Sequence, residues 1–243
     1  MKQKFIQCDN SQCELLADDF FANVYGNSNQ SRFNNAISDI VDVYPKGILI
    51  GAIAASKYIR YPIIPRMTYD VDILLPETEF EMFLDDEIPD SVREKLETHF
   101  ADSDSAMHSM KHRQTGIYVD FLSVQSKPVR KKLIRYILNN RKQTTNILKV
   151  GETRIEIVKP EILIALKLHR YNKNRNTEKG LSDRLDIIKI LKTLCTNDIP
   201  LEISEICERV TKEEFKQYNQ IAADVECEMT CEECMDKDNP CTL

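Results

Sequence analysis

The sequence contains no apolar run that approaches the roughly 20 residues needed to span a bilayer. Its first residues, Met-Lys-Gln-Lys-Phe, do not resemble the start of a signal peptide, and no internal repeat is found. These absences argue against a membrane-spanning protein and predict a cytoplasmic one. The 243 residues, of which 42% are hydrophobic and 30% charged, suffice for one large or two small domains with a proper core.

Charge is unevenly distributed along the chain. The net charge is −6, yet residues 127–179 hold fifteen Lys or Arg against four Glu, a local charge of +11. An acidic protein binds nucleic acid through a basic face rather than through its average charge. This segment is therefore a candidate RNA-binding surface, although scattered lysines that keep a protein soluble would give the same count.

The hydrophobic periodicity predicts an α+β fold, a mixed sheet flanked by helices and followed by a helical C-terminal part. We divide the chain into residues 1–158, an α/β domain with N-terminal helices, residues 159–223, a helical domain, and residues 224–243, an acidic Cys-rich tail. Helices are expected over 14–25, 33–44, 52–61, 128–140, 160–171 and 181–195, a largely helical stretch over 77–100, a polar loop over 172–180, and strands over 47–51, around 70–74, 107–113, 116–124 and 146–158.

Asp70 and Asp72 stand two residues apart in a predicted strand. A strand sends residues i and i+2 to one face, so the two carboxylates can share one Mg²⁺ or hold two. Val71 and Ile73 then point to the opposite face, into a core. A half-buried strand with a solvated acidic side has the same pattern, so the pair alone does not establish a metal site.

Two neighbouring features strengthen the metal hypothesis. Gly51 ends a buried strand and begins a helix, where free backbone N–H groups and the helix dipole suit a phosphate. Asp120 is a lone charge in the apolar strand Tyr-Val-Asp-Phe-Leu, and a buried charge is costly unless it is paired or binds metal. A tight turn that only Gly fits, and a salt-bridged Asp, are the structural alternatives.

Together these residues resemble the active-site motif of the nucleotidyltransferase superfamily, which has a polymerase-beta-like fold, and are most similar to its AbiEii branch of toxins. The likeness covers residues 45–195, and Ala52 stands where the family's usual second Gly or Ser would be. It is carried by Gly51-Ala52, by Arg66-x-Thr68-x-Asp70-Val71-Asp72, by Asp120, by Lys159-Pro160-Glu161-x5-Lys167-Leu168-His169-Arg170, and by Asp183-x2-Asp186.

The resemblance implies a role for each of these residues. Asp70, Asp72 and Asp120 would coordinate Mg²⁺ or Mn²⁺ and act in catalysis, with Lys167 neutralising triphosphate charge and Asp186 completing the site. We favour Asp186 over Asp183 because Ser182 is a plausible helix N-cap and Asp183 would then lie in the first turn. The residues implied in nucleoside triphosphate binding are Gly51, Ala52, Arg66, Thr68 and Arg170, with a structural ion pair as the alternative for Arg66.

The predicted function is thus transfer of a nucleoside monophosphate from a nucleoside triphosphate to an acceptor, expected to be RNA such as tRNA, with a cognate antitoxin as a candidate partner. Three alternatives remain. The protein could be a catalytically weak nucleotide- or RNA-binding regulator, a small-molecule nucleotidyltransferase, or a glycosyltransferase, whose Asp-x-Asp also binds metal. Ala52 keeps the first alternative open.

The eight cysteines fall into two groups. Four are scattered and resemble ordinary small residues or reduced thiols of a cytosolic protein: Cys8, Cys13, Cys195 and Cys207. Four lie within the last seventeen positions and have spacing that a zinc site could use, although a solvated acidic tail with reactive thiols explains them as well: Cys227, Cys231, Cys234 and Cys241.

Overall fold

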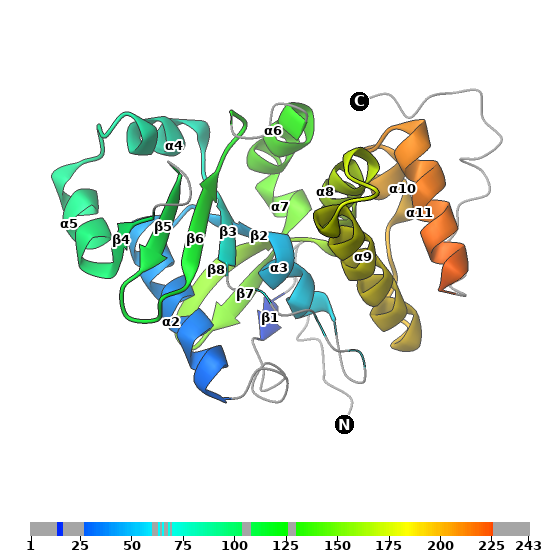
Figure 1. The fold of residues 1–243 in the computed structure, drawn as a ribbon, viewed down its shortest axis with the longest axis horizontal. Coiled ribbons are helices and arrows are strands. Elements are labelled where there is room, and N and C mark those ends of the chain that lie inside the picture. Colours follow the sequence, from blue (N-terminus) through cyan, green and yellow to red (C-terminus); the bar gives the residue numbers. More distant parts are fainter. Residues whose placement is uncertain are drawn as a thin grey trace. The chain divides into compact units, whose positions relative to one another are not determined.

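Figure 1 shows a computed structural model of the chain, which describes residues 14–16, 27–59, 63, 65, 68, 70–103, 108–125 and 130–225. The chain forms two compact units. The sheet unit comprises Met1–Ala54 and Met67–Val158, and the helical unit comprises Ala55–Arg66 and Lys159–Leu243. Residues 55–66 thus fall with the C-terminal helices rather than with the domain that the sequence analysis assigns to them.

The sheet unit is built on a mixed sheet with the strand order β1-β7-β8-β2-β3-β6-β5-β4. β3 runs parallel to β6 and antiparallel to β2, and β2 runs parallel to β8. The strands are β1 (Glu14–Leu16), β2 (Ile48–Ile50), β3 (Asp70–Leu74), β4 (Phe100–Asp102), β5 (Ser109–His112), β6 (Tyr118–Leu122), β7 (Thr145–Val150) and β8 (Thr153–Val158).

Helices flank the sheet and make up most of the helical unit, so the predicted α+β class is confirmed (Figure 1). Local chemistry explains several boundaries. Pro160 begins a helix at a position where its missing N–H costs nothing, and Thr211 forms a capping box with Glu214. The helices are α2 (Asn27–Val43), α3 (Gly51–Tyr58), α4 (Glu77–Leu84), α5 (Asp90–His99), α6 (Lys131–Asn139), α7 (Arg141–Thr144), α8 (Pro160–Lys173), α9 (Glu178–Thr196), α10 (Ile203–Cys207) and α11 (Lys212–Asp224).

One face of the sheet forms the core of the sheet unit. Phe121 of β6 lies on this face, and its ring centroid is 5.2 Å from that of Tyr44 and 5.1 Å from that of Phe83. α2 packs on the same side, against β7 and β8. His112 of β5 secures α2 through a contact of 2.8 Å between its Nε2 and Asp39 Oδ2. Because side chains alternate along a strand, the residues between these core positions face the other way.

The helical unit has an apolar core crossed by a few buried polar contacts. His169 of α8 lies 2.6 Å from Glu214 of α11, measured from Nδ1 to Oε1. Glu161 accepts a hydrogen bond from the backbone N–H of Glu202, and burial raises the pKa of its carboxyl group. Within the described part of the chain, no helix combines the length and apolarity needed to cross a membrane.

Two expectations from the sequence are wrong, and a third holds only in part. Residues 14–16 form β1, parallel to β7, rather than the start of a helix, because strand pairing overrides their helical periodicity. The polar loop expected over 172–180 is present but shorter, at 174–177, since α8 ends at Lys173 and α9 begins at Glu178. Cys195 and Cys207 are disulfide-bonded rather than free thiols.

Candidate functional site

Three aspartates lie together on the sheet face opposite α2. Asp72 of β3 and Asp120 of β6 are register partners in a parallel strand pair, so their side chains share a face and start from strands about 4.8 Å apart. Asp70 lies on the same face, two residues before Asp72. All three are only partly buried. We call Asp70, Asp72 and Asp120 the acid row. The register of β3 with β6 brings these three residues together on one face.

Gly51 packs directly against the acid row. Its φ of +75° is a left-handed conformation that favours glycine. A Cβ atom at this position would lie 2.9 Å from Asp72 Cβ and closer still to its carboxylate oxygen Oδ2. The carboxylate of Asp72 therefore lies beside the first residue of α3, where the positive end of the helix dipole favours a negative charge. Ala52, which follows, is buried.

Thr68 is the other described member of the predicted nucleotide-binding set in this region. Its side chain is buried, and Oγ1 donates a hydrogen bond to Asp70 Oδ1. A carboxylate that accepts a hydrogen bond from a buried hydroxyl is held in one orientation, so Thr68 positions Asp70. Arg66 lies outside the described residues.

Ser109 is a member of the site that the sequence analysis missed. It is the register partner of Asp120 on β5 and so lies on the acid face of the sheet. Its side chain is 5% exposed, and no partner within hydrogen-bonding distance is found for its Oγ among the described residues. A buried hydroxyl without a partner costs free energy, and a ligand group that reached it would supply one. The hairpin predicted from 107–124 could have identified Ser109, had its register been worked out.

The donor chemistry of the acid row fits a magnesium ion. Mg²⁺ prefers carboxylate oxygens and is commonly held by one or two of them, with water and substrate phosphates as further ligands. In the part of the chain that the structure describes, no three or more His, Cys, Asp or Glu side chains converge as a ready ligand set. The arrangement fits a site in which Asp72 and Asp120 supply two ligands and a phosphate supplies others.

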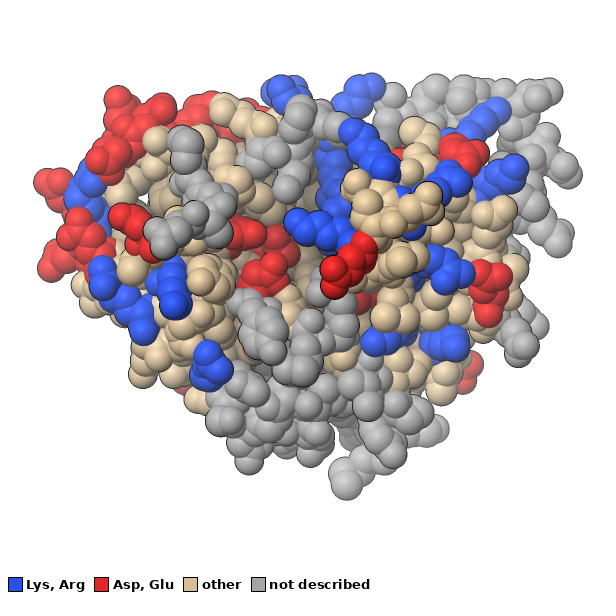
Figure 2. Space-filling view, viewed as in Figure 1, with Lys and Arg blue, Asp and Glu red and all other residues tan. Residues whose placement is uncertain are grey.

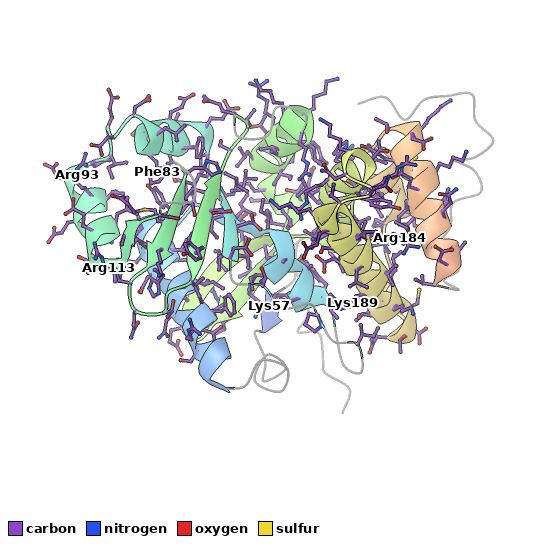
Figure 3. All side chains as sticks on the ribbon, in the orientation of Figure 1. Lys57, Phe83, Arg93, Arg113, Arg184 and Lys189 are labelled. Atoms are coloured by element: carbon purple, nitrogen blue, oxygen red, sulfur yellow. The ribbon has the colours of Figure 1, made fainter. Side chains whose placement is uncertain are left out.

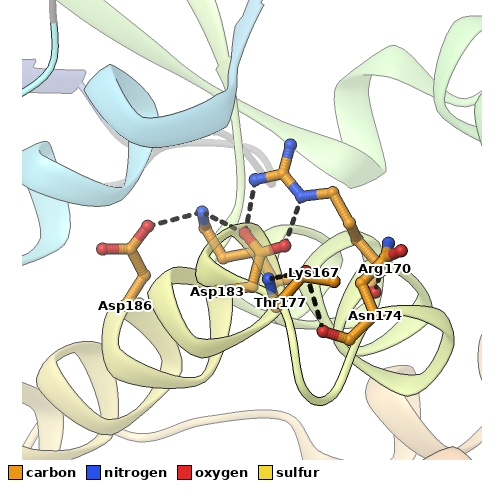
Figure 4. A network of polar contacts seen from close by, with 7 residues as sticks. Lys167, Arg170, Asn174, Thr177, Asp183 and Asp186 are labelled. Atoms are coloured by element: carbon orange, nitrogen blue, oxygen red, sulfur yellow. Dashed lines mark hydrogen bonds and ion pairs between the residues drawn. The ribbon is translucent and has the colours of Figure 1, made fainter.

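The helical unit contains a second group of carboxylates, shown in Figure 4. Lys167 Nζ of α8 lies 2.7 Å from Asp186 Oδ2 and 3.4 Å from Asp183 Oδ1, both on α9. Arg170, one turn after Lys167, forms a bidentate pair with Asp183. Lys167, Asp183 and Asp186 are each at most 3% exposed. We call these four residues the α8–α9 ion-pair cluster.

The sequence analysis expected Ser182 to cap a helix and Asp183 to lie in its first turn, and this expectation is wrong. The N-cap of α9 is Thr177, whose side chain accepts a hydrogen bond from the backbone N–H of Gly180, and not Ser182. Asp183 therefore lies in the second turn, where Lys167 and Arg170 both contact it. Gly180 is required by close approach, because a Cβ there would lie 3.3 Å from the backbone nitrogen of Arg175 and much closer to the carbonyl oxygen of Asn174.

The two groups of aspartates belong to different units. The acid row and Gly51 lie in the sheet unit, whereas Lys167, Arg170 and Asp186 lie in the helical unit. The implied participation of these three residues in one site with Asp70 stays a prediction.

Surface charge is segregated within the sheet unit. Figure 2 shows acidic side chains gathered over α4 and α5, and Lys and Arg side chains over α6. Lys131 and Lys132 of α6 are exposed, whereas Arg141 of α7 lies 3.1 Å from Glu156 Oε2 and is partly neutralised by it. The unit boundary after Val158 divides the basic segment, so its two halves belong to different units. The four cysteines of the proposed zinc site, Cys227, Cys231, Cys234 and Cys241, lie outside the described residues.

No protein-family model matches the sequence, and no curated protein matches it either. The structure is similar to the crystal structure of an antigenic nucleotidyltransferase-like protein from Paracoccidioides brasiliensis, with a TM-score of 0.57 and 14% sequence identity. The similarity covers 87% of this chain and 98% of that chain. At this identity the likeness establishes the fold. The chain therefore has a nucleotidyltransferase-like fold.

Proposed function

We propose that the protein is a Mg²⁺-dependent nucleotidyltransferase, which transfers a nucleoside monophosphate from a nucleoside triphosphate to an acceptor and releases pyrophosphate. The observation that carries the proposal is the register of Asp72 with Asp120, beside the Gly51 turn, in a nucleotidyltransferase-like fold. A solvated acidic strand requires neither a glycine packed on its carboxylate nor a buried hydroxyl beside it.

The chemistry is an in-line displacement at the α-phosphorus. The acceptor oxygen forms a bond to this phosphorus while the bond to the bridging oxygen of the β-phosphate breaks, and pyrophosphate leaves. A bound divalent ion would neutralise charge on the attacking and leaving oxygens. Asp120 would accept the proton of the acceptor hydroxyl, and Thr68 would keep Asp70 oriented through its hydrogen bond. The backbone N–H groups at Gly51 and Ala52 would bind a phosphate oxygen.

The remaining roles rest on the motif resemblance. Lys167 would neutralise charge on the triphosphate, Asp186 would hold Lys167, and Arg66 and Arg170 would contact phosphates. The ion pair between Lys167 and Asp186 supports the second of these roles, because it keeps the ammonium in one place.

We further propose that the acceptor is RNA, such as tRNA, and that the protein belongs with AbiEii-type toxins that have a cognate antitoxin and act in the cytoplasm. The exposed lysines of α6 and the motif Arg66-x-Thr68-x-Asp70-x-Asp72 support this part of the proposal. RNA bound through such a surface releases counterions, so its affinity would fall steeply with salt.

A catalytically weak regulator is the second candidate, and Ala52 favours it. The usual Gly or Ser of the family would add space or a hydroxyl donor there, whereas Ala52 offers only its backbone N–H. A small-molecule nucleotidyltransferase would share the acid row but would need no basic surface. The glycosyltransferase alternative loses its basis, because the fold is nucleotidyltransferase-like.

Incubation with labelled nucleoside triphosphates, Mg²⁺ and total RNA tests the proposal. We expect label to be transferred to RNA by the wild-type protein, and transfer by Asp72→Asn to fall on the order of 10²- to 10³-fold. Asp102→Asn is the matched control, because it removes the same charge from an exposed position on β4. Equal transfer by wild type and Asp72→Asn would refute the site. Nucleotide binding without transfer to RNA or to small acceptors would favour the regulator.

A further inference from the structure

An aromatic side chain lies beside the acid row on the same sheet face. Tyr118 of β6 is the register partner of Asp70 on β3 and of Lys111 on β5. Register partners share a face, so Tyr118 and Lys111 lie across the sheet from Asp70, the acid-row member that is two residues, about 6.7 Å along the strand, from Asp72. We call Tyr118 and Lys111 the Tyr118 platform.

The Tyr118 ring is accessible and carries a cation on one side. Tyr118 is 39% exposed, and Lys111 Nζ lies 5.7 Å from its ring centroid. Lys111 comes from β5 and Asp70 from β3, on opposite sides of β6. The aromatic surface is therefore placed between an ammonium group and the carboxylates of the acid row.

The surroundings of Tyr118 do not suit a protein-docking patch. The other large hydrophobic residues that are exposed in the described part of the chain, Leu181 and Leu185, lie on α9 of the helical unit. Among the residues of the sheet unit that the structure describes, Tyr118 is thus a single exposed aromatic ring between charged neighbours, whereas docking surfaces are contiguous apolar patches. A flat ligand with a polar edge fits such a position.

We propose that Tyr118 stacks on the base of the nucleoside triphosphate, an inference that rests on the proposed function. A triphosphate held at Asp72 and Asp120 carries its base one ribose away from the α-phosphate, and Tyr118 lies at a comparable spacing along the sheet. Aromatic side chains bind every base through its π-face, so the platform accepts nucleotides with little base preference. Lys111 reinforces the stack through its cation–π contact with the ring.

A cross-strand Lys–Tyr pair also stabilises a sheet, so the test needs a readout that a structural role would not move. The sequence contains no tryptophan. Tyr118→Trp therefore creates a single fluorescent reporter at the platform. Phe83→Trp creates the matched control, because Phe83 packs on Phe121 on the opposite face of the sheet and is labelled on α4 in Figure 3.

We expect Mg²⁺ with a nucleoside triphosphate to quench Tyr118→Trp fluorescence and to leave Phe83→Trp unchanged. Mg²⁺ with inorganic tripolyphosphate, which has no base, should quench neither variant. Calorimetry with the same probes should show that Tyr118→Leu weakens nucleotide binding about 5- to 100-fold and leaves tripolyphosphate binding unchanged. Tyr118→Phe, which keeps the ring, should bind nucleotide within about twofold of wild type.

The outcomes separate this inference from the proposed function. If Asp72→Asn abolishes Mg²⁺-dependent nucleotide binding while Tyr118→Leu binds nucleotide as wild type does, the platform is refuted and the acid row stands. If tripolyphosphate quenches Tyr118→Trp as strongly as a nucleotide does, the ring senses phosphate rather than base, and the inference also fails. If the wild-type protein binds neither probe, both proposals are wrong.

Discussion

The chain contains two groups of aspartates that resemble each other in sequence and differ in structure. Asp70 and Asp72 lie two apart on a strand, whereas Asp183 and Asp186 lie three apart on a helix. Both spacings place the carboxylates on one face. Yet the acid row is only partly buried, whereas Asp183 and Asp186 are at most 1% exposed and are neutralised by Lys167 and Arg170.

This difference separates two ways of keeping carboxylates inside a fold. A fully buried carboxylate must be paired, because desolvation of a lone charge costs several kcal/mol. The α8–α9 ion-pair cluster meets that requirement with side chains from its own unit. A partly exposed row keeps contact with solvent and can exchange water for a metal ion or a phosphate. The comparison therefore assigns ligand binding to the row and a stabilising role to the two carboxylates of the cluster, which hold Lys167 and Arg170 in place.

The strongest test of this assignment is removal of one cluster carboxylate. Asp183→Ala leaves Arg170 and Lys167 near an empty buried position, and we expect it to lower the free energy of unfolding by about 3–5 kcal/mol. Asp120→Asn, in the acid row, should lower it by less than about 1 kcal/mol. Urea unfolding followed by circular dichroism measures both. Equal losses in the two variants would mean that the acid row is as structural as the cluster.

A smaller effect is expected at Gly51. Gly51→Ala combines left-handed backbone strain, about 1–2 kcal/mol, with a clash on the Asp72 carboxylate. Gly151→Ala is the matched control, because Gly151 has a φ of +60° and a Cβ atom there would meet no described heavy atom within 4 Å. Both variants should lose stability, but only Gly51→Ala should also lose Mg²⁺-nucleotide affinity in calorimetry. Unchanged affinity would show that the contact with Asp72 does not shape the site.

A further effect, seen only as the pH is raised, concerns a lysine of the helical unit that is not in the cluster. Burial lowers the pKa of Lys57, labelled in Figure 3, to about 7. Between pH 7 and 10.5 the unfolded chain therefore binds more protons than the folded chain at this site, and the free energy of unfolding should rise with pH by about 1–3 kcal/mol. Below pH 7 the ammonium is charged in both states, and the folded state retains the cost of its burial.

Lys57→Met should remove this rise, and Lys179→Met, at an exposed position of α9, should retain it. Thermal unfolding measured across the same pH range would show the two slopes. A wild-type slope that survives in Lys57→Met would assign the pH dependence to another group.

Local patterns in the sequence were sufficient for the acid-bearing strands. Alternation around Asp70 and Asp120 predicts which residues face the core, and the structure places Val71 and Phe121 there. The β5–β6 hairpin follows equally from its turn and its apolar alternation. These features depend on neighbours in sequence, which is why the sequence alone predicts them.

Features that depend on distant partners could not be predicted in this way. Ser109 belongs to the site only because its strand pairs with β6 in one particular register. The start of α9 at Glu178 reflects the close approach of Gly180 to Asn174, and Asp183 is buried because two cations from α8 contact it. Neither the strand pairing nor the helix packing is encoded in a short window of residues.

The shared register of β3 and β6 also determines which sequence changes the protein can tolerate. Asp120 and Phe121 occupy adjacent positions with opposite orientations, so deletion of one residue early in β6 would exchange them. A carboxylate would then enter the core beside Tyr44, and an aromatic ring would replace it in the acid row. Insertions and deletions in this strand should therefore be as strongly selected against as substitution of the aspartates themselves, although Val119 and Phe121 play no chemical role.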